Sequence, residues 1–239
     1  MKKLSQAIAL AGVMTAVAVP AVQAEVEVSA SAAVANMYLW RGQDLGQGVP
    51  AVSGDLKVSA GGAYGGVWTS SGDTTAGQEY DLFVGYGGES GDFSYDVSAW
   101  TYVYSGDDEE NGRGNTFGLT DLIVSAGYGP VSASYYYVLA GDEDYSYVTL
   151  TGEYDKFSAT LGMASGIENI GETTKTVYDD SDYTHLDVSY AYNDNISFTL
   201  SKVIAQSLKA EDAATSEEDE SYVDEDLKVV VSYSLPIEL

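Results

Sequence analysis

Few residues in this chain could carry out catalysis, because its 239 residues include one histidine, His185, and no cysteine. Without cysteine the chain can form no disulfide, thiolate metal site or cysteine nucleophile, and one histidine excludes any site that needs two imidazoles. A serine activated by His185 is the catalytic pairing that is left. His185 shares its parity with Asp187 and Ser189 and alternates with Leu186, so we expect it at a wet lumen or rim, bonded to water. We therefore predict no catalytic residues and no enzymatic activity.

The acidic residues form a second candidate set, since 37 of them stand against 10 basic residues and give a net charge of -27. Two runs, 107–110 and 217–226, are rich in the carboxylates that calcium prefers. Neither run has the Asp-x-Asp/Asn-x-Asp/Asn-Gly spacing of a calcium loop, so we interpret both as solvated charge and predict no metal site and no cofactor. Nucleic acid is excluded as a partner on the same grounds, because its binding needs a basic surface.

A third set of polar and aromatic residues alternates with apolar residues at a spacing of two. In a β-strand this spacing places the polar set on one face, which in a closed barrel is the lumen. Its seven acids and two bases predict a net negative interior, whereas its aromatic members either line a constriction or simply pack the lumen. The candidate pore-lining residues are Asp55, Lys57, Glu79, Asp81, Asp96, Trp100, Tyr102, Asp121, Tyr136, Glu153, Asp187 and Lys228.

The elements that must position these residues are strands. Alternation of period two recurs in segments of about the length that a tilted transmembrane strand requires. We count twelve such segments, at residues 26–38, 51–60, 63–70, 78–87, 93–104, 117–128, 131–139, 145–154, 157–165, 184–192, 196–203 and 227–239. The sequence therefore predicts an all-β fold, a single antiparallel up-and-down transmembrane β-barrel of about 12 strands.

The connections between these segments alternate between short turns and longer, acidic loops. The short turns fall at 61–62, 87–92, 129–130, 155–156 and 193–195, and the longer loops at 41–50, 71–77, 105–116, 140–144, 166–182 and 204–226. Bacterial outer-membrane barrels have short periplasmic turns and long outer loops, whereas a soluble sandwich has no reason to sort its loops in this way.

Aromatic residues fall where a membrane-spanning barrel places its two interfacial girdles. The short-turn ends carry Tyr86, Phe93, Tyr95, Tyr128, Tyr154, Phe157, Tyr190, Tyr192 and Tyr233, and the long-loop ends carry Trp40, Trp68, Tyr80 and Tyr137. The last segment alternates to the carboxyl end at Leu239, as terminal strands recognised by the barrel-assembly machinery do. We therefore expect outer-membrane lipid and this machinery as partners.

The first 24 residues have the features of a secretory signal peptide. Lys2 and Lys3 precede an apolar run from Leu4 to Val19, and Val22-Gln23-Ala24 fits the cleavage rule. We predict cleavage after Ala24, a mature barrel of residues 25–239, and location in the outer membrane of a Gram-negative bacterium.

Three stretches carry a resemblance to a known family. They are Tyr38-Leu39-Trp40-Arg41-Gly42, Ala63-Tyr64-Gly65-Gly66-Val67-Trp68, and Glu79 to Tyr86 followed by Gly91-Asp92-Phe93-Ser94-Tyr95-Asp96-Val97. In this order they resemble the TorF-type porins, a proteobacterial family of small outer-membrane barrels. The resemblance implies a pore-like outer-membrane protein and supplies no substrate or catalytic residue.

Two functions are open from the sequence, beside a third interpretation as a soluble periplasmic β protein, which would be extractable without detergent. The first is a channel for passive diffusion of small solutes or ions, with a preference for cations because of its acidic lumen. The second is a non-conducting barrel whose acidic loops serve surface interaction or ion retention.

The alternation also predicts which side chains face lipid and which face the lumen. Leu82, Val84, Val188 and Val231 should point outward, and Asp81, Asp96, Asp187 and Ser232 inward.

Overall fold

The structure is a computed structural model that describes residues 25–73, 76–105, 115–141, 145–165, 182–207 and 223–237. The predicted signal peptide, both acidic runs up to residue 222, and Leu239 lie outside these described residues. Across the described ranges no helix is long and apolar enough to cross a membrane.

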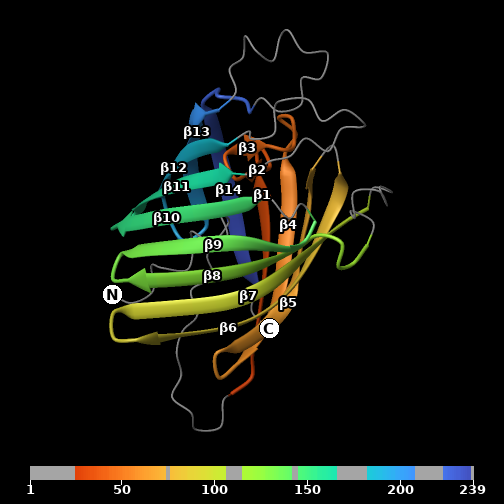
Figure 1. Ribbon diagram of the computed structural model, residues 1–239, viewed down its shortest axis with the longest axis vertical. Helices are drawn as coiled ribbons and strands as arrows, with labels where there is room; N and C mark the ends of the chain where they lie inside the picture. Colours follow the sequence, from red (N-terminus) through yellow and green to blue (C-terminus); the bar gives the residue numbers. More distant parts are fainter. Residues whose placement is uncertain are drawn as a thin grey trace.

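Fourteen strands make up the regular structure of the described residues (Figure 1). Twelve of them close into a barrel, and β2 and β3 form a separate two-stranded sheet. The strands are β1 Glu27–Ala35, β2 Leu39–Trp40, β3 Gln43–Asp44, β4 Ala51–Ala60, β5 Ala63–Asp73, β6 Gly77–Ser90, β7 Phe93–Tyr104, β8 Thr120–Tyr128, β9 Val131–Ala140, β10 Ser146–Tyr154, β11 Phe157–Ser165, β12 Tyr183–Ala191, β13 Ile196–Gln206 and β14 Lys228–Ile237.

The barrel closes through β1, which pairs antiparallel with β4 on one side and with β14 on the other. Ala30, for example, lies opposite Leu56 and also opposite Ile237. Every other barrel strand pairs with its neighbours in the chain, so the sheet is an up-and-down meander without a free edge. The prediction of a closed antiparallel barrel of about 12 strands is confirmed.

One end of the barrel, here called the short-turn rim, carries the connections 61–62, 91–92, 129–130, 155–156 and 192–195. Gly61 and Gly62 have φ values of 58° and 88°, the left-handed pair that a two-residue hairpin needs. The opposite end, the long-loop rim, carries the remaining connections. One of these is shorter than predicted, because β5 and β6 extend past the expected boundaries and leave only residues 74–76 between them.

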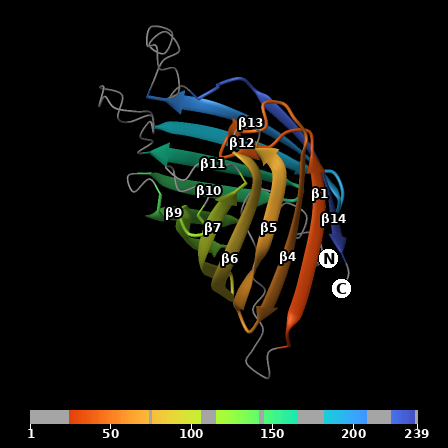
Figure 2. The same ribbon diagram turned by 90° about the vertical axis from the view of Figure 1, so that its right-hand side faces the viewer.

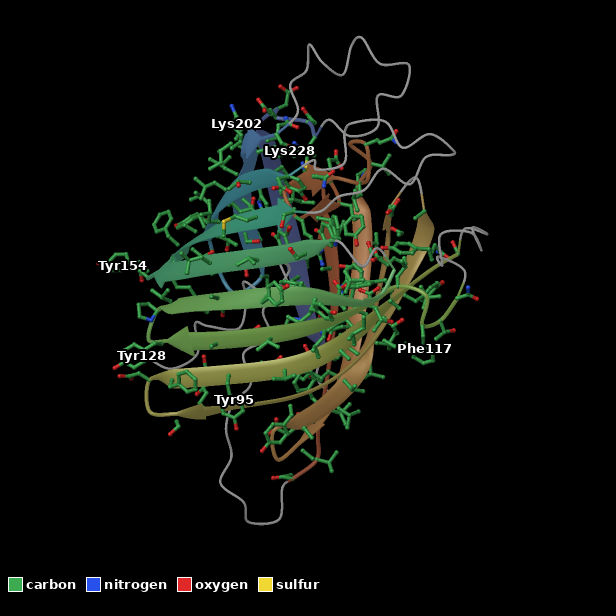
Figure 3. All side chains as sticks on the ribbon, in the orientation of Figure 1. Tyr95, Phe117, Tyr128, Tyr154, Lys202 and Lys228 are labelled. Atoms are coloured by element: carbon green, nitrogen blue, oxygen red, sulfur yellow. The ribbon has the colours of Figure 1, made fainter. Side chains whose placement is uncertain are left out.

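Side chains are sorted across the barrel wall with apolar groups outward and polar groups inward. Leu82 and Val84 are 42% and 64% exposed, whereas Asp81 between them is 5% exposed. At the short-turn rim Tyr95, Tyr128 and Tyr154 point away from the barrel (Figure 3). This is the reverse of a soluble protein, in which apolar groups are inside.

Two of the aromatic residues predicted for the outer girdle lie inside instead. Trp68 is opposite Asp55 and Asp81 in the strand register, so it shares their inward face. The alternation around it is ambiguous, because Val67 and Trp68 are adjacent apolar residues and only the pairing with neighbouring strands decides which faces out. Trp40 also lies inside, because β1 ends at Ala35 and the chain then turns into the barrel mouth instead of continuing to Tyr38.

Candidate functional site

Residues 36–50, called here the inward segment, fold into the mouth of the barrel. Residues 41–50 were predicted as an outer loop and residues 36–38 as the end of the first strand, so both predictions are wrong here. Figures 1 and 2 show its two strands, β2 and β3, beside the upper ends of the barrel strands. The two-residue turn of this hairpin is Arg41-Gly42, with φ values of 47° and 81°. A left-handed φ at both positions suits a tight hairpin. This backbone conformation costs free energy at Arg41, because arginine has a side chain, and the contacts of the Arg41 guanidinium offset that cost.

The Arg41 side chain is the centre of the mouth. One guanidinium nitrogen lies 3.0 Å from Asp121 Oδ2, and the other donates to Tyr145 Oη at 2.7 Å. The guanidinium carbon is 4.4 to 5.2 Å from the centroids of four aromatic rings, those of Trp40, Tyr136, Tyr145 and Tyr147. A buried cation is tolerated here because a carboxylate pairs with it and ring faces surround it.

The tip of the hairpin is docked on β12. Gln43 donates to Tyr183 Oη at 2.8 Å, and Tyr183 in turn donates to the carbonyl of Arg41 at 2.9 Å. A Cβ on Gly42 would come within 2.6 Å of the Cβ of His185. Only glycine allows this approach, so the position of the inward segment depends on Gly42.

The start of the inward segment is fixed on the opposite wall. Tyr38 donates a short hydrogen bond to Glu79, which also accepts from Tyr104 at 2.9 Å. Burial, followed by the nearby charge of Glu79, raises the pKa of the Tyr38 phenol above its ordinary value, so the hydroxyl stays protonated and acts as a donor. Glu79 is therefore a structural anchor as well as a lumenal acid.

His185 faces the lumen, as its parity predicts, but it is 1% exposed instead of wet. Its Nε2 lies 2.6 Å from Tyr147 Oη and its Nδ1 lies 3.0 Å from Asp187 Oδ1. The tautomer that carries its proton on Nδ1 can donate to Asp187 and accept from Tyr147. Because Tyr147 and Asp187 engage both ring nitrogens, the imidazole is held in one orientation. It forms the part of the wall against which Gly42 of the inward segment packs.

Below the mouth, nearer the short-turn rim, the lumen is polar. Tyr64 donates to the Asp96 carboxylate at 2.7 Å, and the Lys57 ammonium lies 4.4 Å from the Tyr64 ring centroid. Asp55 accepts a short bond from Ser31. Hydroxyl pairs join neighbouring strands at 2.8 to 2.9 Å: Ser125 with Ser134, Thr151 with Thr160, and Ser189 with Thr199.

The predicted pore-lining residues thus fall into separate groups. Tyr102, which donates to Asp121 at 3.1 Å, meets Asp121 and Tyr136 around Arg41. Trp100 stacks on Phe83 at 4.3 Å, so it packs against the wall.

Glu153 is exposed at the short-turn rim, far along the barrel from the Arg41 group. Lys228 is buried at the long-loop rim, where it lies 3.3 Å from Asp224. The backbone N–H of Asp226 donates to Asp224, and this bond, opposed by slight burial and aided by Lys228, lowers the pKa of the Asp224 carboxyl. These two predicted residues share no contact with the mouth.

A cavity of about 380 Å³ lies at the mouth beside the inward segment. Its walls include Trp40, Arg41, Tyr102, Asp121 and Tyr145, together with residues from the ends of the long-loop connections. This volume is in the range of small-molecule sites, and its mixture of rings with a few polar groups is typical of them. Within the described ranges, no group of three or more acidic, histidine or cysteine residues could hold a metal ion.

Arg41, the residue around which the mouth is organised, was not among the predicted site residues. Its signal in the sequence is weak: an isolated arginine between Trp40 and Gly42, in a stretch with no other basic residue from position 4 to position 56. Its partners are 80 to 104 residues away in the chain. Local alternation could not have brought them together.

These features define a closed 12-stranded antiparallel β-barrel with a polar lumen and a mouth narrowed by its own chain. The chain belongs to the bacterial family described as "Bacterial protein of unknown function (Gcw_chp)", whose profile matches residues 20–234. The likeness to TorF-type porins stays a prediction. No curated protein matches the chain significantly.

Two solved structures are similar in fold. The first is described as "Unveiling the Mechanism Behind the in-meso Crystallization of Membrane Proteins"; it is 11% identical, has a TM-score of 0.51, and the match covers 87% of this chain and 83% of that chain. The second is the crystal structure of Acinetobacter baumannii OccAB3, at 9% identity and a TM-score of 0.37, covering 79% of this chain and 56% of that chain. At these identities the first likeness shows the fold alone, and the second carries no argument.

Proposed function

We propose that this protein is an outer-membrane barrel of the porin-like class, through which small hydrophilic solutes diffuse passively. The observation that carries the proposal is the sorting of side chains in a closed barrel, with an apolar outer surface and a charged, hydroxyl-rich lumen. A bilayer accepts strands only when every backbone group is paired, and closure of β1 on β14 meets that condition. Lipid then covers the outward surface, which would otherwise be a large exposed apolar patch.

The aromatic side chains on the outside support the same orientation. Tyr128 and Tyr154, 69% and 83% exposed, lie at the short-turn rim, where amphipathic rings favour the membrane interface. By analogy with outer-membrane barrels this rim is periplasmic, and the long acidic loops face outward. Delivery by a cleaved signal peptide of residues 1–24 and insertion by the barrel-assembly machinery complete the proposal.

Cation preference is the second part of the proposal. Seven acidic side chains were predicted for the lumen. The basic side chains there are Lys57, Lys228 and Arg41, which the structure adds to the predicted set. Arg41 and Asp121 pair with each other, and Lys228 lies with Asp224 at the rim, so the remaining acids outnumber the free base. Carboxylates along a narrow passage raise the local concentration of cations and lower that of anions.

The inward segment favours a second function, a barrel that does not conduct. Arg41, with the four rings around it, occupies the mouth, and Tyr38 and Gln43 hold the segment on two walls. In that case the acidic outer loops would carry the activity, as surface for interaction or ion retention. A solute-uptake experiment with vesicles, described next, separates the two functions.

Proteoliposomes test the proposal. Vesicles that contain the refolded mature protein are placed in isosmotic solutions of small solutes, and swelling is followed by light scattering. We expect swelling with solutes the size of glycine or a monosaccharide, slower swelling with larger oligosaccharides, and none in protein-free vesicles. Absence of swelling with every small solute would contradict the channel and support the non-conducting barrel.

A further inference from the structure

We propose that Asp81 is the centre of a binding site for a monovalent, ammonium-type cation, on the inner wall just below the mouth. This inference deepens the proposed function and rests on it for the route by which the cation arrives. Asp81 is 5% exposed, and its Oδ1 is buried with no hydrogen-bond partner among the described residues. A buried, unpaired acceptor of this kind costs free energy unless a ligand satisfies it.

Two further acidic side chains lie close to Asp81. Glu79 lies two residues along the same strand and on the same face, and the carboxylates of Glu79 and Asp121 both act electrostatically on Asp81. Asp121 is neutralised by Arg41 at 3.0 Å, whereas Glu79 accepts only from neutral phenols. No basic side chain is paired with Asp81 in the described structure, so a cation is the missing partner.

Aromatic rings indicate which class of cation the site takes. In the register of the sheet, Asp81 lies directly between Trp68 on β5 and Tyr102 on β7. Residues directly opposite each other share a face, with Cβ atoms about 5 Å apart. A carboxylate flanked on both neighbouring strands by aromatic residues suits an ammonium group, which is attracted to ring faces as well as to the charge.

A divalent metal does not fit this position. Metal ions of that class need several oxygen or nitrogen ligands at short distance, and the described residues contain no such group of three. Asp81 offers one carboxylate oxygen without a hydrogen-bond partner. An ammonium group, which carries only hydrogen-bond donors, matches this single acceptor.

The site is adjacent to the cavity at the mouth. Tyr102 lines the 380 Å³ cavity beside the inward segment, and the same residue is the register partner of Asp81. The cavity wall at Tyr102 is therefore one strand away from Asp81. We expect solutes with an ammonium group to be favoured over alkali ions.

Binding can be measured without conduction. The refolded protein in detergent micelles is titrated with methylammonium chloride, with sodium chloride at equal ionic strength as the reference, and tryptophan fluorescence is recorded because Trp68 flanks Asp81. We expect saturable binding that Asp81→Asn weakens by about tenfold or more, the loss expected for one charge-assisted hydrogen bond. Asp81→Glu should keep part of the affinity.

Asp55→Asn is the matched control, because Asp55 is also an inward acid but is already bonded to Ser31. It should bind methylammonium as the wild type does, and circular dichroism checks that each variant is folded. Wild-type protein without saturable binding, or Asp81→Asn with unchanged affinity, would overturn the inference. If binding depends on Asp81 while proteoliposomes do not swell, the cation site stands and the proposed channel falls.

Discussion

Individual glycines decide how closely the lumenal rings can pack. Gly162 lies directly opposite His185 in the register of β11 and β12, and a Cβ at this position would overlap His185 Nε2 and Tyr147 Oη. The hydrogen bond between Tyr147 and His185 therefore exists because residue 162 has no side chain. Gly152 on β10 is a contrasting case, since a Cβ there would meet nothing within 4 Å.

This contrast gives a prediction at the residue scale. Gly162→Ala should lower the free energy of unfolding by about 1 to 3 kcal/mol, because the added methyl forces His185 or Tyr147 from its place. Gly152→Ala, the control, should stay within about 0.5 kcal/mol of wild type. Urea unfolding of the refolded protein in detergent, followed by circular dichroism, measures both. Equal stabilities of the two variants would contradict the packing described for His185.

The inward segment is the element that lies in the mouth of the barrel. It contains two glycines with left-handed backbone, Gly42 with φ 81° and Gly48 with φ 78°. Of these two glycines, only Gly42 packs against the barrel wall. A Cβ added to Gly42 would lie 2.6 Å from the Cβ of His185, whereas a Cβ added to Gly48 would meet no atom within 4 Å. The two positions share the same backbone requirement and differ in what surrounds them.

Gly42→Ala should therefore displace the inward segment and widen the mouth. Both alanine variants incur about 1 to 2 kcal/mol for a left-handed alanine, but only Gly42→Ala also meets His185. We expect a higher conductance per channel for Gly42→Ala than for wild type in planar bilayers, and an unchanged conductance for Gly48→Ala. If both variants conduct like the wild type, the inward segment does not limit the passage.

The strands could be predicted from the sequence and the inward segment could not, for a physical reason. Strand alternation and the glycine turns, such as Gly61-Gly62, are local signals that can be read within ten residues. The inward segment depends on contacts such as Arg41 with Asp121 and Gln43 with Tyr183, which are 80 and 140 residues apart. Trp68 shows the same limit, because its direction is fixed by pairing with Asp55 and Asp81 on neighbouring strands.

At the scale of the whole molecule, the polarity of the barrel is inverted relative to a soluble protein. Outward Val84 and Val188 are exposed, while inward Ser201 and Asp81 are buried. Closure of the sheet and this inversion together match the proposed membrane barrel, in which an apolar solvent lies outside and a polar lumen inside. The lumenal acids, more than the outer loops, should then control which ions pass, because bulk salt screens exposed charges beyond about 10 Å at 0.1 M.

The reversal potential across a planar bilayer with a KCl gradient tests this account most directly. We predict that the refolded protein conducts and that the reversal potential has the sign expected for a cation-selective channel. This selectivity should be retained at moderate salt. Neutralising lumenal Asp81 and Asp96 to asparagine should reduce the potential more than neutralising Asp107 and Asp108. A protein that does not conduct, an anion-selective potential, or selectivity controlled only by Asp107 and Asp108 would contradict it.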